Sequence, residues 1–121
     1  MTLDELLTRL GLGEDQDIEF KAADGGLPKS LWESFSVFGN TDGGYIVLGV
    51  SEKNHAFQIV GVKNVGALKK NFWDSHNNPQ KLSTQLCNED SIRTAELEGK
   101  RIVMLHVPRA GSGRYLSMVI P

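Results

Sequence analysis

Basic side chains gather in two regions of the sequence, and they are the residues best suited to contact phosphate groups. They are Lys63, Lys69 and Lys70 in one region, and Lys100, Arg101, Arg109 and Arg114 in the other. Lysine and arginine contacts to phosphates hold nucleic acids in a salt-dependent way. The spacing predicts either a local phosphate-binding patch or separate, solvated charges. Phe72 and Trp73, next to the first group, could either stack on bases or pack in the core.

The stretch 38–50, FGNTDGGYIVLGV, contains a second candidate for phosphate contact. Gly43 and Gly44 allow positive φ and let bare backbone approach another group closely. Such a turn is either a tight packing corner or a place where main-chain N–H groups meet an anion. Asn40 and Asp42 suit turn formation, which favours the packing corner.

Several common active-site patterns are absent from the sequence. There is no G-x-x-x-x-G-K-S/T loop for a nucleoside triphosphate and no G-x-S-x-G element for a serine nucleophile. His55, His76 and His106 are far apart and Cys87 is the only cysteine, so no zinc-binding spacing occurs. A single cysteine also excludes an internal disulfide, and we expect a cytoplasmic protein.

Size and composition are those of one ordinary globular domain. The chain has 121 residues, of which 40% are hydrophobic and 23% charged. No apolar run approaches the roughly 20 residues that cross a bilayer, so we expect no membrane partner. The net charge of -2 and the pI of about 5.9 argue against a grip on nucleic acid over the whole surface, because such binders are usually basic. Any nucleic-acid site must therefore be local.

Residue patterns in the first half predict helix, strand, helix and strand in that order. Thr2 is a suitable N-cap for a helix over residues 2–11. Residues 17–21 alternate apolar and polar side chains, as a half-buried strand does. A second helix is expected over 28–39, and the apolar run 44–50 is typical of a buried strand.

The second half adds strands and a third helix. A returning strand is expected at 57–62, and a helix at 64–77. Two strands at 92–97 and 101–107 form a second hairpin, and residues 115–120 could begin a last strand. Together these elements predict a single α+β domain, with a mixed, mostly antiparallel sheet flanked by about three helices.

Two motifs give the chain a resemblance to a known family. They are I-E-F-K at residues 18–21 and N-T-D-G-G-Y-I-V-L-G-V at 40–50, followed by I-V-G-V at 59–62. The pairing resembles the Schlafen AlbA-type domain of bacterial transcriptional regulators and animal Schlafen proteins, over about residues 14–107. The resemblance implies that residues 1–121 are one such domain, the N-terminal part of a longer DNA-binding regulator.

The same resemblance implies an acidic site. Nuclease members of the family place one glutamate five residues before the E-F-K glutamate and an acid after the G-V strand. Glu14, Glu19 and Glu52 match these positions, although the nuclease pattern has aspartate at the third. Three convergent carboxylates could hold Mg²⁺ or Mn²⁺ for phosphodiester cleavage, with Lys21 neutralising a phosphate. Alternatively, Glu14 and Glu52 are solvated and Glu19 pairs with Lys21 at the surface.

The sequence therefore predicts a nucleic-acid-binding domain of a transcriptional regulator, with DNA or RNA as partner and with neither enzymatic activity nor a cofactor of its own. The residues expected to contact nucleic acid are Lys21, Lys63, Lys69, Lys70, Lys100 and Arg101. A metal-dependent endoribonuclease that uses the three glutamates is the first alternative. The second alternative is a protein-interaction module that forms homo-oligomers through the apolar segment 115–121.

Overall fold

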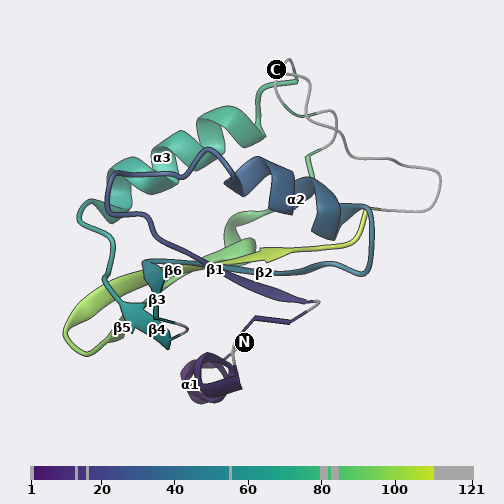
Figure 1. Ribbon diagram of the computed structural model, residues 1–121. Helices are drawn as coiled ribbons and strands as arrows, with labels where there is room; N and C mark the ends of the chain where they lie inside the picture. Colours follow the sequence, from purple (N-terminus) through teal and green to yellow (C-terminus); the bar gives the residue numbers. More distant parts are fainter. Residues whose placement is uncertain are drawn as a thin grey trace.

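The computed structural model describes residues 2–12, 14–15, 17–54, 56–79, 82 and 85–110. The described residues form the helices α1 (Leu3–Leu12), α2 (Leu31–Gly39) and α3 (Val65–His76), and a 3-10 turn, η1 (Glu89–Ser91). Helices α2 and α3 lie on one face of a four-stranded sheet, and α1 lies on the opposite face (Figure 1). The predicted α+β arrangement of about three helices around a sheet is confirmed.

The four-stranded sheet has the order β1-β2-β6-β5. Its strands are β1 (Ile18–Lys21), β2 (Gly44–Leu48), β5 (Ile92–Leu97) and β6 (Lys100–Val107). Strands β1 and β2 are parallel and are connected through α2, whereas β6 runs antiparallel to both β2 and β5. The sheet is therefore mixed and mostly antiparallel, as predicted.

Alternation along the strands divides the apolar side chains between two cores. Ile46 on β2 packs beneath α2 and α3 with the fully buried Phe35 and Phe72. Val47, the next residue, points to the other face and packs with Leu6 of α1. Because successive strand residues face opposite ways, the near-continuous apolar run of β2 serves both cores.

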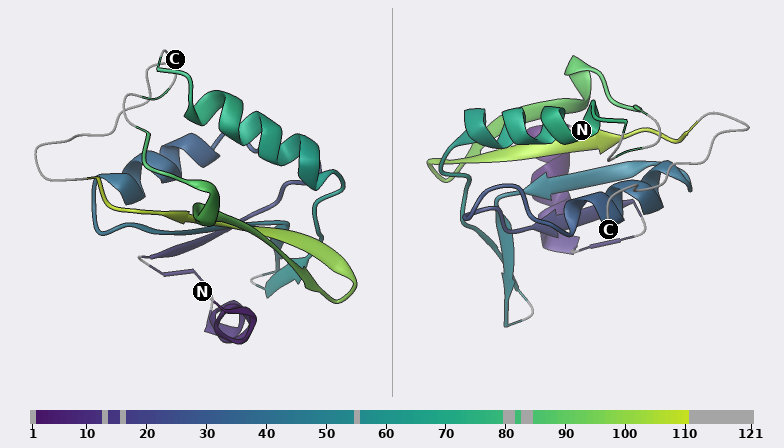
Figure 2. Two further views of the ribbon diagram at one scale, coloured as in Figure 1. Left: turned by 180° about the vertical axis from the view of Figure 1, so that it is seen from behind. Right: turned by 90° about the horizontal axis from the view of Figure 1, so that it is seen from above.

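The predicted strand 44–50 is divided in two at Gly49. This residue has a φ of +105°, which turns the chain so that β3 (Val50–Lys53) leaves the main sheet and pairs with β4 (Ala56–Ile59). The two-stranded β3–β4 hairpin projects from the body of the domain (Figure 2). The backbone N–H groups of residues 60 and 61 both donate to the Gly49 carbonyl at 2.8 Å, so β4 ends before the predicted end of strand 57–62.

The Gly43–Gly44 turn is a packing corner. The Gly43 N–H donates to the Phe38 carbonyl at 2.9 Å, so this group is not offered to an anion. A Cβ atom on Gly43 would lie 2.8 Å from the Val107 carbonyl oxygen, and one on Gly44 would lie 2.5 Å from the Phe38 ring. No side chain fits where the end of α2 meets the start of β2, and the packing alternative is correct.

Gly44→Ala should lower the free energy of unfolding by about 1–3 kcal/mol, because the added methyl group overlaps the buried Phe38 ring. Urea unfolding followed by circular dichroism measures the change. Gly25→Ala is the matched control, since nothing lies within 4 Å of a Cβ atom there. We expect its effect to stay within about 0.5 kcal/mol. Equal losses in the two variants would contradict the role of the corner.

His76, at the end of α3, connects this helix to the segment before η1 through a hydrogen bond. The residue is 1% exposed, and its Nε2 accepts a hydrogen bond from the Cys87 N–H at 3.0 Å. Nδ1 lies 2.8 Å from Asn77 Oδ1, and the ring stacks on Phe72 with centroids 5.5 Å apart. Because Nε2 is an acceptor, the ring is neutral and carries its proton on Nδ1. Burial lowers the pKa of His76 from its ordinary value, which also favours the neutral form.

The lowered pKa of His76 predicts a pH-dependent stability. Between the ordinary pKa of 6.5 and the lower folded value, the unfolded chain binds a proton that the folded chain does not. Stability is therefore complete above pH 6.5 and decreases as the pH falls toward the folded pKa. Urea unfolding between about pH 7.5 and about pH 5 should show this slope, and His76→Gln should reduce it, leaving the part that comes from the lowered pKa of His106. The same slope in both proteins would contradict the assignment.

Some sequence predictions fall outside the described residues. They include the strand at 115–120, the C-terminal segment 115–121 proposed to pair between copies, His55 and Arg114. Within the part of the chain that is described, no helix is both long and apolar enough to cross a membrane.

Candidate nucleic-acid interface

Three of the predicted phosphate-binding residues meet at one end of the domain. Lys63, Lys100 and Arg101 line a hollow of about 260 Å³ beside Gly61 and Gly99. We call it the Lys63 hollow. It combines residues from the chain before α3 and from the turn between β5 and β6, which are far apart in the sequence.

The β5–β6 turn places two of these cations. Glu98 and Gly99 have φ values of 53° and 73°, the left-handed conformation that suits a two-residue hairpin turn. Lys100 and Arg101 follow as the first residues of β6, so both are exposed at the end of the sheet. The Glu98-Gly99 pair between two apolar segments is a local sequence signal for a hairpin turn. The hairpin that it predicted is confirmed.

Two long-range hydrogen bonds bring Lys63 to the turn. The Val62 N–H donates to the Arg101 carbonyl at 2.8 Å, and Lys100 Nζ donates to the Ile59 carbonyl at 3.1 Å. Lys63 follows Val62 directly and is itself exposed. The backbone therefore holds the three cations near one another, and neither bond involves a neutralising carboxylate.

The Lys63 hollow keeps its positive charge. Within the described chain, Lys63, Lys100 and Arg101 make no ion pair. Glu96 stands opposite Arg101 in the β5–β6 register, and Glu98 lies in the turn, so acids are near but are not bonded to these cations. The chain as a whole has a net charge of -2, so any site for nucleic acid must be a local group of cations. The Lys63 hollow is such a group.

The other predicted basic contacts lie elsewhere. Lys69 and Lys70 are on α3 and do not line the Lys63 hollow. Lys70 forms an ion pair with Asp74 one helical turn later, at 3.0 Å. Their contact with nucleic acid stays a prediction. Phe72 cannot stack on a base from its present position, because it is fully buried and stacks on Trp32 with centroids 5.4 Å apart.

Trp73 is the second aromatic residue that the sequence offers for base stacking. It is partly buried and packs against the core that contains Phe35 and Ile46, edge-on to Phe72, with centroids 4.9 Å apart. The sequence left two alternatives for Phe72 and Trp73, base stacking and core packing. In the structure both rings pack in the core.

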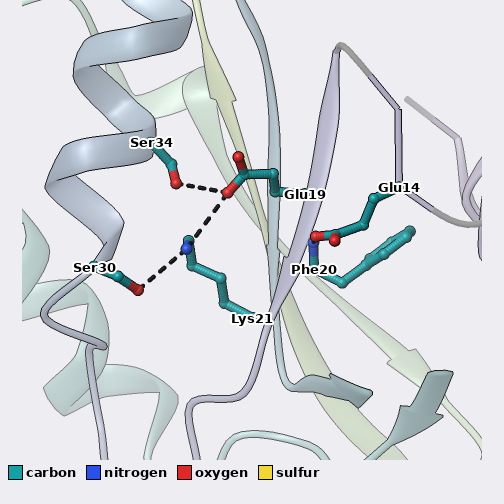
Figure 3. Close-up of polar contacts among 6 residues, drawn as sticks. All are labelled: Glu14, Glu19, Phe20, Lys21, Ser30 and Ser34. Atoms are coloured by element: carbon teal, nitrogen blue, oxygen red, sulfur yellow. Dashed lines mark hydrogen bonds and ion pairs between the residues drawn. The ribbon is translucent and has the colours of Figure 1, made fainter. Parts of the chain in front are cut away.

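Glu19 and Lys21 tie β1 to α2. Glu19 Oε2 accepts a hydrogen bond from Ser34 Oγ at 2.5 Å and lies 3.4 Å from Lys21 Nζ. Lys21 Nζ also donates to Ser30 Oγ at 3.1 Å (Figure 3). The Lys21 side chain is only 15% exposed. The polar side of the I-E-F-K motif therefore makes a strand-to-helix tether, and Lys21 is not displayed beside the Lys63 hollow.

Glu14 lies on the other side of β1 (Figure 3). Its Oε2 accepts a hydrogen bond from the Phe20 N–H at 2.9 Å. Strand β1 is at the edge of the sheet with β2 on its inner side, and the Phe20 N–H lies on the outer side. An unpaired strand edge can pair with another chain, so the Glu14 carboxylate closes part of this edge.

The three predicted metal ligands are not gathered in one place. Glu14 and Glu19 contact protein groups on different sides of β1, and Glu52 is exposed on β3 opposite Phe57. Among the residues that the structure describes, no three His, Cys, Asp or Glu side chains are grouped to hold a metal ion. The nuclease alternative stays a prediction, and the described geometry gives each glutamate a separate position.

Cys87 is not placed for nucleophilic chemistry. Burial raises the pKa of its thiol to about 12, so the thiolate is not formed at neutral pH. Its Sγ lies 3.6 Å from the His106 carbonyl oxygen, which it can reach as a weak donor.

Two serines of α2 test the strand-to-helix tether. Ser34→Ala removes the hydroxyl that bonds to Glu19 and should lower the free energy of unfolding by about 1–2 kcal/mol. Ser36→Ala is the matched control on the same helix, since Ser36 Oγ is buried without a hydrogen-bond partner in the described structure. Removing the Ser36 hydroxyl should leave the free energy of unfolding unchanged or raise it slightly. Guanidinium unfolding compares the two, and a larger loss for Ser36→Ala would contradict the tether.

The model of the Schlafen, AlbA_2 family matches residues 14–118. A search of curated proteins finds no match.

Two solved structures share the fold. The N-terminal domain of a RecG-related protein from Nitrosomonas europaea has a TM-score of 0.68 and 23% identity, over 88% of this chain and 72% of that one. The DIP2311 protein from Corynebacterium diphtheriae has a TM-score of 0.55 and 14% identity, over 97% of this chain but only 23% of that one. At these identities the likeness concerns the fold.

Proposed function

The chain belongs to the Schlafen, AlbA_2 family, and from this premise we propose that it is a nucleic-acid-binding domain. The observation that carries the proposal is the Lys63 hollow, where three cations without ion-pair partners in the described chain meet. The domain binds DNA or RNA through phosphate groups, has no enzymatic activity of its own, and serves in a transcriptional regulator.

The shape of the Lys63 hollow supports phosphate binding. Gly61 and Gly99 line it without side chains, so a phosphate can approach the backbone between the cations. Phosphate contacts position a nucleic acid without reading its sequence, which suits three flexible or forked cationic groups. One of the similar structures is the N-terminal domain of a protein described as related to RecG, an ATP-dependent DNA helicase. That description agrees with a DNA contact.

Replacing the three cations should weaken binding in a salt-dependent way. In Lys63→Gln/Lys100→Gln/Arg101→Gln, the slope of log affinity against log salt should become shallower by about 2 to 3, because each lost phosphate contact removes about 0.7 to 0.9. Fluorescence anisotropy with labelled single- and double-stranded DNA and RNA over a salt series measures this slope.

The matched control changes charges elsewhere and is compared with the double variant Lys63→Gln/Arg101→Gln. Lys29→Gln/Lys53→Gln alters two exposed lysines that lie outside the Lys63 hollow and outside the predicted contacts, and it should leave most of the slope intact. Equal weakening in the two double variants would reject the Lys63 hollow as the site. Wild-type binding that does not change with salt would reject phosphate recognition itself.

The same samples separate a binding domain from an endoribonuclease. RNA incubated with the protein and Mn²⁺ should remain intact on a denaturing gel, as it does with EDTA. Cleavage that requires Mn²⁺ and is lost in Glu19→Gln would overturn the non-enzymatic proposal. The Gln side chain keeps an oxygen that can accept the Ser34 hydrogen bond, so the variant should still fold.

A further inference from the structure

A second hollow, of about 320 Å³, lies on the opposite end of β6 from the Lys63 hollow. It opens between Thr2, which precedes α1, and η1. The residues of the sheet and of η1 that line it are Tyr45, Asp90, Ser91, Arg93, Met104 and His106. None of these residues has a role in the proposed phosphate contact.

Two aromatic rings form one wall of this hollow. Tyr45 on β2 and His106 on β6 stand directly opposite in the strand register, with ring centroids 4.9 Å apart and planes at 36°. Met104 lies two residues before His106, on the same face of β6, and is 8% exposed. Met104 supports the pair from the core, and the two rings make a surface of the kind on which flat ring systems stack. We call it the Tyr45–His106 platform.

A cation stands next to the platform. Arg93 on β5 is opposite Met104 in the register, so Arg93 and His106 are diagonal neighbours, with Cα atoms about 7–8 Å apart in such a ladder. Arg93 Nε donates to the Asp90 carbonyl at 3.4 Å, and the guanidinium forms no ion pair with any described residue. Its remaining N–H groups can therefore contact an anion.

We propose that the Tyr45–His106 platform binds one nucleotide of a single-stranded nucleic acid, with the base stacked on the exposed His106 ring, against which Tyr45 packs, and its phosphate held by Arg93. This inference rests on the proposed function and extends it to a second site. Base faces are covered by their neighbours in a duplex and are exposed in single strands, so a stacking surface selects single strands. Asp90 also lines this hollow, and a carboxylate can accept a hydrogen bond from an exocyclic amino group of the base.

The platform should contribute affinity that salt does not weaken. Burial lowers the pKa of His106, so its ring is neutral at neutral pH and stacks as an uncharged aromatic group. Stacking on neutral rings releases few counterions, unlike the contacts of the Lys63 hollow. Only Arg93 adds a salt-dependent part at this site.

Single-stranded DNA that carries 2-aminopurine between two abasic sites tests the proposal, because the fluorescence of this base is quenched when it stacks and no neighbouring base quenches it in the free strand. The wild type should quench it on binding. Tyr45→Leu and His106→Ala should remove the quenching and weaken single-strand binding between about 5-fold and about 150-fold, with the salt slope unchanged. Tyr45→Phe is the conservative control and should retain both properties. Circular dichroism and urea unfolding confirm that each variant is folded.

The outcomes distinguish this site from the proposed function. If the wild type binds single strands but shows no quenching, or if Tyr45→Leu and His106→Ala bind as the wild type does, the platform is rejected and the Lys63 hollow still stands. If duplex affinity falls as much as single-strand affinity in these variants, stacking is also rejected. If the wild type binds neither form, the proposed function fails, and this inference fails with it.

Discussion

The close contact between the end of α2 and the start of β2 is the constraint on which the rest of the domain depends. Two residues without side chains let the Phe38 ring and the end of β6 approach the turn to a distance that no Cβ atom would permit. The turn directs β2 into the middle of the sheet, where it pairs with β1 on one side and β6 on the other. The polypeptide at Gly43 and Gly44 therefore serves packing, and the Gly43 N–H is already bonded to the Phe38 carbonyl.

The polar residues of the I-E-F-K motif have a comparable structural role. Glu19 bonds to Ser34 of α2 and Lys21 to Ser30 just before this helix, while Ile18 and Phe20 face the opposite core. Glu14 then closes the outer edge of the same strand. A motif that reads as acidic chemistry in sequence is used here to hold an edge strand of only four residues in place. Such a short strand has few backbone bonds of its own, so side-chain contacts matter for it.

An acidic chain can bind nucleic acid only where its geometry separates cations from acids. Strand β6 does this at its first residues, where Lys100 and Arg101 meet Lys63 in a hollow that contains two glycines. Its far end carries a different chemistry, because His106 pairs with Tyr45 to form an aromatic surface. The two ends of one strand thus carry the proposed salt-dependent contact and the proposed stacking contact, and such contacts are the two components of single-strand binding.

Most of the fold could be predicted from the sequence, because its signals are local. Alternation in residues 18–21, the positive-φ turn at Glu98 and Gly99, and helical spacing in α2 and α3 each depend on neighbours within a few residues. The division of strand 44–50 escaped prediction, because the bend at Gly49 goes with hydrogen bonds to its carbonyl from residues 60 and 61, which are distant in the sequence.

Which charged residues lie together was decided by the tertiary structure alone. The basic residues were identified by type, but the bond from Val62 to the Arg101 carbonyl selected Lys63, Lys100 and Arg101 from among them. The same reason separates Glu14 from Glu19, since one bonds along the sheet edge and the other to a helix. Sequence patterns determine which way a side chain faces on its own element, and only long-range packing determines what it meets there.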